Sequence, residues 1–356
     1  MHDHLAEPPV RLPPAKQDME PTRETYYYSR VHRLYETSLD VYKPALPPPD
    51  GAPLVVVVVG SAWLGHQPAI YIGTDWWNSS GPKTIASLGC VCVAIRHRGA
   101  FICAPPAWAA LLLVAVLAAQ AMLHAAVPTA AMLCLSMWTA WAWAARGAAS
   151  HDDMLDDVGS ALVWVKANQH RLVAPGAEQV SAVHLFGGYS SGGHVAASLL
   201  QAPEKLTAKG LALPAAGYDG ILLLSGVLGA RSSEPQPPCL PAALATAGLA
   251  KLTFGWRGAA VLPSPLHTPE RCPKVPHLLV HCRHEVFNLP LLEAALSHLL
   301  CSELYAAALR RLGVPTRIES VESDHWFVLG SQALRDALRK ALIDDRFGAP
   351  KEAPTK

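Results

Sequence analysis

The chain has 356 residues, of which 51% are hydrophobic, so it can bury the core of one large domain or of two ordinary ones. A formal net charge of +1 provides no electrostatic basis for a nucleic-acid partner, and we expect none. The eight cysteines contain no Cys-x-x-Cys pair, which favours buried free thiols over a disulfide framework or a zinc site.

The first 30 residues mix prolines, charges and three consecutive tyrosines without a sustained period, so we predict that residues 1–30 are a disordered tail. The same segment lacks the basic and apolar regions of a secretory signal peptide. We expect the first strand at 39–44, where polar and apolar residues alternate. Residues 54–59 are unbroken and mostly β-branched, which predicts a central strand buried on both faces of a parallel sheet.

The next stretch, residues 65–83, is predicted as a long aromatic-rich loop that either lines a pocket or covers the sheet edge. A short helix is expected at 85–88, and residues 90–98 are predicted as the next buried strand. Cys90 and Cys92 should share one face of that strand, because successive side chains on a strand alternate.

A long uncharged stretch follows, since residues 99–145 contain no Asp, Glu, Lys or Arg. Two apolar runs within it, 108–123 and 126–145, would be about 24 and 30 Å long as helices, against roughly 30 Å for the hydrocarbon core of a bilayer. The strand before the stretch and the helix after it belong to one sheet domain, so both ends must lie on the same side of any membrane. We therefore expect residues 99–146 to form an inserted apolar helical hairpin.

From this hairpin we predict that the protein contacts a membrane through residues 105–145. Tryptophans near its ends would lie at one interface, and Arg96, Arg98 and Arg146 flank the same side, which the positive-inside bias makes cytoplasmic. We expect a membrane-associated protein with its main domain in the cytoplasm, on an endomembrane such as the endoplasmic reticulum. An apolar lid or an interfacial hairpin is the alternative, because alanine is a weak membrane residue and the first run is short.

Residues 183–197 carry the most informative pattern in the chain. An apolar run typical of a strand ends at glycines, residues 188–192 read Gly-Tyr-Ser-Ser-Gly, and a helix pattern of small residues follows at once. A strand, a sharp turn and a helix in this order expose a serine hydroxyl at the top of a sheet. Glycine is needed two residues either side of Ser190, because a Cβ there would collide with a neighbouring strand or helix. The five-residue motif alone is weak, so its flanks carry the prediction.

The remaining elements alternate between helix and strand. An amphipathic helix is predicted at 151–165, and residues 230–274 are rich in proline with little periodicity. The other expected features are a core strand at 220–226, a strand and acid-bearing loop at 275–286, a helix at 288–312, a last strand at 316–321, a closing helix at 332–343 and a disordered tail at 349–356.

Ser190, Glu285 and His325 are the candidate catalytic residues. A serine hydroxyl is a poor nucleophile until a base takes its proton, and the base needs a third group to hold its tautomer. Glu285 follows a late strand and His325 follows the last strand, and this order of serine, acid and histidine resembles that of the α/β-hydrolases. Asp324 is the rival acid, although a residue seldom reaches Nδ1 of its own neighbour. We interpret four other histidines as surface or core residues: His184, His194, His281 and His284.

A resemblance to a known family starts at residues 59–63, Val-Gly-Ser-Ala-Trp. They are similar to the His-Gly-Gly-Ala-Trp turn of α/β-hydrolases of the esterase/lipase type, which include the isoprenylcysteine methylesterases and related carboxylesterases. The resemblance covers about 39–98 and 147–345. It implies an α/β-hydrolase fold, with a mainly parallel central sheet and flanking helices, in a catalytic domain split into 31–98 and 147–348. Part of a cap is expected within 230–274.

The resemblance also implies an oxyanion hole, in which backbone N–H groups stabilise the developing negative charge. Its residues here would be Gly60, Ser61, Ala62 and Ser191. Two departures from the family turn are Val59 in place of histidine and Ser61 in place of glycine. Since the donors are backbone groups, the hole survives provided that Ser61 does not need a positive φ.

The predicted reaction is hydrolysis of a carboxylic ester through an acyl-enzyme, without a metal or an organic cofactor. The apolar insert favours a lipophilic substrate, and the resemblance suggests a prenylated cysteine methyl ester. We expect Trp63 and Tyr189 to contact the substrate. Two alternatives are an amidase or formamidase with the same three residues, and a catalytically weak, membrane-tethered binding protein with this fold.

Overall fold

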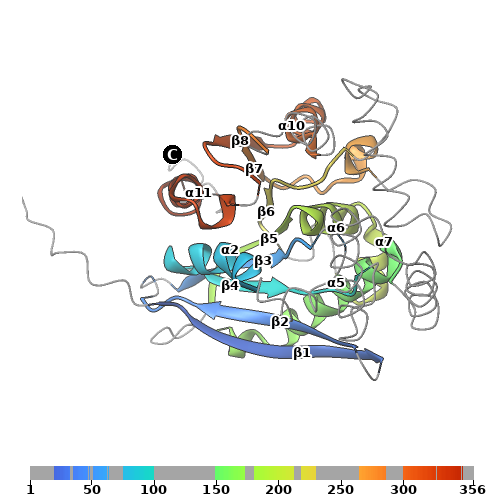
Figure 1. Cartoon of the computed structure of the whole chain (residues 1–356). Helices are drawn as coiled ribbons and strands as arrows, with labels where there is room; N and C mark the ends of the chain where they lie inside the picture. The colour runs from blue at the N-terminus through green and yellow to red at the C-terminus, as the bar shows by residue number, and fades with distance from the viewer. Residues whose placement is uncertain are drawn as a thin grey trace, which may run out of the picture.

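The computed structural model of the chain describes residues 20–32, 35–46, 48, 51–61, 63, 75–99, 149–172, 180–211, 218–229, 264–285, 300–325, 327–345 and 347. Strands within these residues form one eight-stranded sheet in the order β1-β2-β4-β3-β5-β6-β7-β8 (Figure 1). Their bounds are β1 Thr22–His32, β2 Tyr35–Lys43, β3 Ala52–Val58, β4 Val91–Ile95, β5 Val180–Tyr189, β6 Gly220–Leu224, β7 His277–Cys282 and β8 Thr316–Val321. The β1–β2 and β2–β4 pairs are antiparallel, and all other pairs are parallel, which confirms the predicted mainly parallel sheet.

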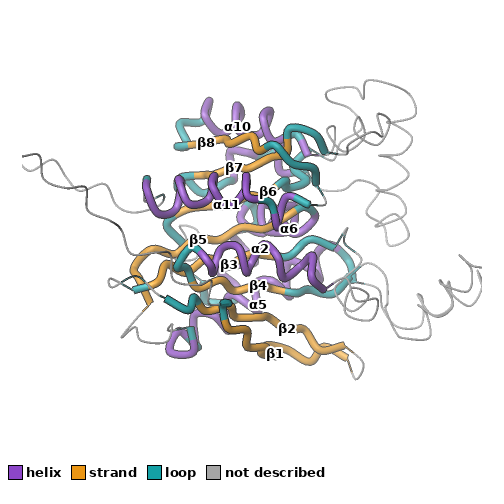
Figure 2. The backbone as a smooth tube through the Cα atoms, turned by 60° about the vertical axis from the view of Figure 1, so that its left-hand side comes forward, coloured by secondary structure: helices purple, strands orange, loops and turns teal. Residues whose placement is uncertain are grey.

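Helices pack on both faces of this sheet (Figures 1 and 2). Helices α5, α6 and α10 contribute to the hydrophobic core on one face, and α2 and α11 contribute to the core on the other. The helix bounds are α2 Asp75–Ser87, α5 His151–Ala167, α6 Ser191–Leu200, α7 Pro203–Ala208, α10 Ser302–Arg311 and α11 Gln332–Leu338, which continues as a π-helix over Arg339–Asp344. Short 3-10 helices lie at Gln169–Arg171, Pro265–His267, Pro269–Arg271 and Val328–Gly330.

The central strands contribute side chains to both cores. Val56 of β3 packs in the core on the α5 side, whereas Val55 and Val57 pack in the core on the α2 side. An unbroken run of β-branched residues fits this position, because each side of the strand is covered by helices. Cys90 and Cys92 both lie in the α2-side core, so the prediction that they share one face is confirmed. All the described cysteines are buried.

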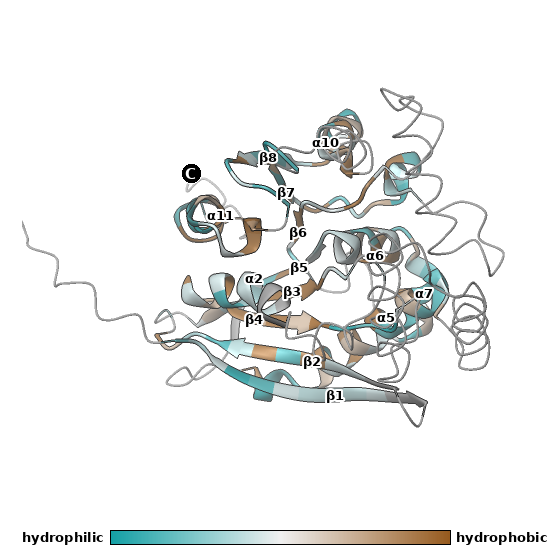
Figure 3. Ribbon diagram, viewed as in Figure 1, coloured by the Kyte–Doolittle hydropathy of each residue, from teal (hydrophilic) through white to brown (hydrophobic). Residues whose placement is uncertain are grey.

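The predicted disordered tail, residues 1–30, is wrong in its second part, because residues 22–30 belong to β1. Tyr26 and Tyr28 pack against the α5-side core, and the ring centroid of Tyr26 lies 4.9 Å from that of Trp164 on α5. Tyr27 points the other way and is 63% exposed. Three identical residues in a row conceal this alternation in the sequence, and β1 is mostly pale or hydrophilic in Figure 3.

Helix α2 is longer than predicted. The sequence indicated an aromatic-rich loop over 65–83 and a helix only at 85–88. Gly81 and Pro82 both have a low helix propensity. Both residues lie inside α2 in the structure. Packing explains why Gly81 is accommodated there: a Cβ on it would lie 3.0 Å from Leu329 Cδ2. Tertiary contacts have overridden local propensity at this point.

Helix α5 confirms the predicted amphipathic helix at 151–165. It starts with a capping box, in which Ser150 Oγ accepts a hydrogen bond from the Asp153 N–H and Asp153 Oδ2 accepts one from the Ser150 N–H. Leu155, Val158 and Leu162 form the buried stripe.

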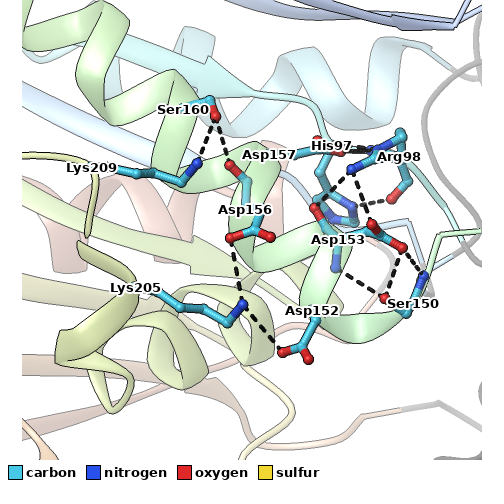
Figure 4. A network of polar contacts seen from close by, with 10 residues as sticks. All are labelled: His97, Arg98, Ser150, Asp152, Asp153, Asp156, Asp157, Ser160, Lys205 and Lys209. Carbon is cyan, nitrogen blue, oxygen red and sulfur yellow. Dashed lines mark hydrogen bonds and ion pairs between the residues drawn. The ribbon is translucent and has the colours of Figure 1, made fainter. Parts of the chain in front are cut away.

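Polar contacts join the two points where the described chain breaks off around residues 100–148. The N–H of Ala149 donates to the carbonyl oxygen of Gly99 at 3.0 Å. Arg98 donates to Asp157 Oδ2 on α5 through both its backbone N–H and its Nε, each at 2.9 Å (Figure 4). The described residues on the two sides of 100–148 therefore lie next to each other.

Several predicted features lie outside the described residues. They are the first part of the N-terminal tail, most of the aromatic-rich loop, the inserted hairpin from residue 100 onward, most of the proline-rich segment and the tail at 349–356. Within the part of the chain that is described, no helix combines the length and the apolarity needed to span a bilayer.

Candidate active site

Ser190 lies at the turn between β5 and α6, above the carboxyl end of the parallel strands. Its φ of 54° and ψ of −126° are strained for a residue with a side chain. Backbone hydrogen bonds hold this conformation: the Ser190 N–H donates to Leu224 O at 3.0 Å, and the Ser190 carbonyl accepts from the N–H groups of His194 and Val227. The strain is therefore maintained by β6 and α6 rather than by the turn alone.

Glycines on either side make this turn possible. A Cβ on Gly188 would lie 2.5 Å from the carbonyl oxygen of Gly192 at the start of α6. A Cβ on Gly192 would lie 2.2 Å from the carbonyl oxygen of Val58 at the end of β3. Both distances are too short for real atoms, so the predicted need for glycine two residues before and after Ser190 is confirmed.

Glu285 and His325 come from loops after β7 and β8. Ser190 Oγ lies 2.9 Å from His325 Nε2, and His325 Nδ1 lies 3.1 Å from Glu285 Oε2. Since a carboxylate can only accept, Nδ1 carries the imidazole proton and Nε2 is free to accept the serine proton. The His325 N–H also donates to the Glu285 carbonyl at 3.0 Å. The structure thus brings all three predicted catalytic residues into one hydrogen-bonded chain.

The rival acid has another partner. Asp324 Oδ1 accepts a hydrogen bond from the Phe327 N–H at 2.9 Å, which closes the turn that carries His325. The extra methylene of Glu285, compared with aspartate, does not prevent contact with His325. Both side chains are 6% exposed, so this pair is nearly shielded from water.

Of the predicted oxyanion residues, Gly60, Ser61 and Ser191 lie beside Ser190. A Cβ on Gly60 would come within 2.8 Å of Ser190 Cβ, so the turn after β3 packs directly against the nucleophile. The N–H of Ser61 donates to Ser191 Oγ at 2.9 Å. Ser61 does not have a positive φ. The serine that replaces the family's glycine therefore needs no unusual backbone conformation. Ala62 lies outside the described residues.

Trp63 and Tyr189 were both predicted to contact the substrate. Trp63 is 3% exposed, and its indole N–H donates to His194 Nδ1 at 3.2 Å. Tyr189 donates its hydroxyl proton to the backbone carbonyl of His325, and its ring stacks on the imidazole with centroids 5.3 Å apart. The structure therefore gives each side chain a protein partner that the sequence did not indicate. The residue before the serine varies freely in such a motif, so no sequence signal pointed to the contact with His325.

Electrostatics at the site favour a neutral tyrosine. Burial raises the pKa of Tyr189 well above its usual value, and the nearby Cys282, Glu285 and Asp324 raise it further. The hydroxyl of Tyr189 is consequently a permanent donor. Within the described residues, no group of three or more His, Cys, Asp or Glu side chains is arranged to hold a metal ion.

Comparison with known proteins gives relatives in structure but none in sequence. No protein-family model matches the chain, and no curated protein matches it. A thermostable esterase from Pseudomonas putida ECU1011 aligns over 91% of this chain and 81% of its own, with 16% identity and a TM-score of 0.52. The esterase Est22 aligns over 92% of this chain and 81% of its own, with 15% identity and a TM-score of 0.51. With its strand order and its two helical layers, the chain has the fold of these esterases, the α/β-hydrolase fold.

Proposed function

We propose that the protein is a serine hydrolase that cleaves a carboxylic ester. The observation that carries the proposal is the hydrogen-bonded chain from Ser190 Oγ through His325 to Glu285, with distances of 2.9 and 3.1 Å. In this proposal Ser190 is the nucleophile, His325 the general base and Glu285 the group that orients the imidazole. The esterase fold supports the choice of substrate class.

In the first step, His325 Nε2 takes the proton of Ser190 as Oγ attacks the ester carbonyl. Positioned proton transfer of this kind accelerates a reaction by about 10² to 10⁴. Negative charge develops on the carbonyl oxygen, and the N–H groups of Ser61, Ala62 and Ser191 stabilise it. The Ser61 N–H must exchange its bond to Ser191 Oγ for one to this oxygen.

In the second step, the imidazolium donates its proton to the departing alcohol, and the acyl group stays on Ser190. Water then enters, His325 removes its proton, and the attack on the acyl-enzyme releases the acid and restores the hydroxyl. The Glu285 carboxylate stabilises the imidazolium in both halves of the reaction. The residues named supply every proton transfer, so the scheme needs no cofactor.

For the substrate, we propose a lipophilic ester, and a prenylated cysteine methyl ester is the specific candidate. The support is the sequence: the apolar stretch at 99–146 and the resemblance of residues 59–63 to the esterase turn. The same stretch supports attachment to a membrane through residues 105–145, with the catalytic domain on its cytoplasmic side. Separating cells into membrane and soluble fractions checks the attachment, and carbonate extraction distinguishes spanning from peripheral binding.

A fluorophosphonate probe tests the catalytic proposal. The wild-type protein should be labelled on Ser190, and Ser190→Ala should not be labelled. Turnover of p-nitrophenyl esters of increasing chain length, compared with arylformamides and with prenylcysteine methyl esters, then separates an esterase from an amidase or formamidase. An unlabelled wild-type protein that is folded would reject the serine hydrolase and favour a binding protein with this fold.

A further inference from the structure

Tyr189 makes two different contacts with the proposed general base. Its hydroxyl donates a hydrogen bond to the backbone carbonyl of His325. Its ring stacks on the imidazole, with an interplanar angle of 27° and centroids 5.3 Å apart. One side chain therefore restrains both the loop that carries His325 and the orientation of its ring.

The position of Tyr189 in the sheet makes these contacts significant. It is the last residue of β5 and directly precedes Ser190, whereas His325 follows β8. Strands β6 and β7 separate β5 from β8 in the sheet. Glu285 after β7 also contacts His325, through its backbone carbonyl and through Oε2. Tyr189 links the base to the strand that carries the nucleophile.

The chemistry of Tyr189 fits positioning rather than proton transfer. Burial and the neighbouring acidic groups keep its hydroxyl protonated, so it donates throughout the cycle. Its ring face is also the surface that an imidazolium prefers, because the π system is negative on its face. His325 becomes an imidazolium when it takes the proton of Ser190 in the proposed reaction.

We infer that Tyr189 is a positioning residue that holds His325 in line with Ser190, in place of the substrate contact that its sequence position predicted. The inference rests on the proposed function. If the inference holds, removing the hydroxyl of Tyr189 lengthens the average distance between Ser190 Oγ and His325 Nε2. The chemical step then slows, and kcat falls. A substrate contact would instead affect binding.

Two variants separate the hydroxyl from the ring. Tyr189→Phe keeps the stacked ring and loses the hydrogen bond, and Tyr189→Leu loses both. We expect kcat to fall about tenfold in Tyr189→Phe and about a hundredfold in Tyr189→Leu. Displacing a catalytic group by about 1 Å lowers the rate by up to about 10². KM should stay within about twofold of wild type in both. The rate of fluorophosphonate labelling at Ser190 should fall in the same order.

Tyr305→Phe is the matched control. Tyr305 is a fully buried tyrosine on α10 whose hydroxyl lies 3.3 Å from Cys272 Sγ, so the substitution also removes a buried hydroxyl contact. It should leave kcat, KM and the labelling rate unchanged. Thermal unfolding of all three variants checks that the chain is folded at the assay temperature.

The outcomes distinguish this inference from the proposed function. Wild type labelled at Ser190, with a fall in kcat at constant KM in Tyr189→Phe, supports the positioning role. A rise in KM at constant kcat, or no change in either, overturns the positioning role but does not affect the proposal that the protein is a serine hydrolase. Equal losses in Tyr189→Phe and Tyr305→Phe also overturn it, because the effect is then one of stability. A folded wild type that is not labelled removes the proposed function and the inference together.

Discussion

On one side of the site, Ser190 is held by the backbone: β6 and α6 supply its hydrogen bonds, and glycines leave room for the turn. On the other side, His325 is held largely by side chains, with Glu285 on one ring nitrogen and Tyr189 on its carbonyl and ring face. The nucleophile is thus positioned by close packing of the main chain. The base is positioned by side-chain groups that a substitution can remove without changing the backbone. Substitutions should accordingly damage the fold on the first side and the rate on the second.

The largest effect is expected from Gly192→Ala on the nucleophile side. The new Cβ would lie 2.2 Å from Val58 O, a backbone atom that cannot move without shifting β3. We expect a loss of stability above about 3 kcal/mol, together with loss of fluorophosphonate labelling. Urea unfolding measures it.

Gly226→Ala is the control for this substitution. Among the described residues, the nearest atom to its Cβ would be Gly193 Cα of α6, at 3.5 Å. It should cost less than about 1 kcal/mol. Similar stability for the two variants would contradict the idea that main-chain packing positions Ser190.

On the base side, Glu285→Gln should keep the shape and lose the charge. The amide can still contact His325 Nδ1, but it does not stabilise an imidazolium and can impose the wrong tautomer. We expect kcat to fall about 10³- to 10⁴-fold with little change in urea unfolding. Ester turnover measures the loss.

Asp324→Asn tests the rival acid in the same loop. Its side-chain oxygen can still accept from the Phe327 N–H, so kcat should fall by less than about tenfold. A greater loss in Asp324→Asn than in Glu285→Gln would reverse the assignment of the acid.

Strand β7, which precedes Glu285, carries a pH-sensitive residue, His277, at its opposite end. Its Nδ1 lies 2.7 Å from the Val275 carbonyl oxygen, its Nε2 lies 3.2 Å from Cys272 Sγ, and the side chain is buried. Burial lowers its pKa from 6.5 to about 4, despite the opposing effect of the bond to Val275. Above pH 6.5 the ring is neutral in both the folded and the unfolded chain, and it contributes no pH dependence.

Between pH 6.5 and about 4, only the unfolded chain binds this proton. The free energy of unfolding therefore falls by about 1.4 kcal/mol for each unit by which the pH is lowered. The total is about 3 kcal/mol, and below pH 4 the dependence on this residue ends. His277→Gln should remove this slope while leaving the remaining titrations in place. Urea unfolding at several pH values from 7 to 4.5 measures it, and equal slopes in the variant and wild type would exclude the assignment.

The smallest effect is expected at the hydrogen bond from the Ser61 N–H to Ser191 Oγ, which joins a backbone group to a side chain. The Ser191 hydroxyl holds the turn of the proposed oxyanion donors until the Ser61 N–H moves to the substrate oxygen. Ser191→Ala loosens this turn but also removes the acceptor that competes with the oxyanion, so kcat should fall by less than about tenfold without a change in KM. Ser198→Ala, on the same helix, removes a buried hydroxyl that has no hydrogen-bond partner among the described residues, and it should leave kcat unchanged. Equal kcat values for the two variants would show that the Ser61 contact is dispensable.

The comparison also explains which predictions the sequence could support. The turn at Ser190 is local: its glycines, its strand and its helix are adjacent in the chain, so their pattern was visible. The order of serine, acid and histidine predicted three residues that the structure brings within hydrogen-bonding distance. The β3 valines were equally readable, because burial on both faces needs a continuous apolar run.

Other features depended on partners far along the chain. The alternation of Tyr26, Tyr27 and Tyr28 became visible only once α5 was packed against β1. Helix α2 continues through Gly81 and Pro82, where packing against Leu329 outweighs propensity. The contact between Tyr189 and His325 joins residues 136 positions apart, and either residue type is compatible with many neighbours.

The sequence by itself determined the arrangement that short-range sterics control: the two-sided strands, the capped helix at α5 and the strained serine turn that only glycines permit. The tertiary structure decided what depends on distance in space rather than along the chain. It chose Glu285 rather than Asp324 as the partner of His325 Nδ1, gave Trp63 and Tyr189 protein partners, and placed Gly99 beside Ala149. Side-chain hydrogen bonds and close packing leave no periodic trace in a sequence, because their partners are set by the folded sheet.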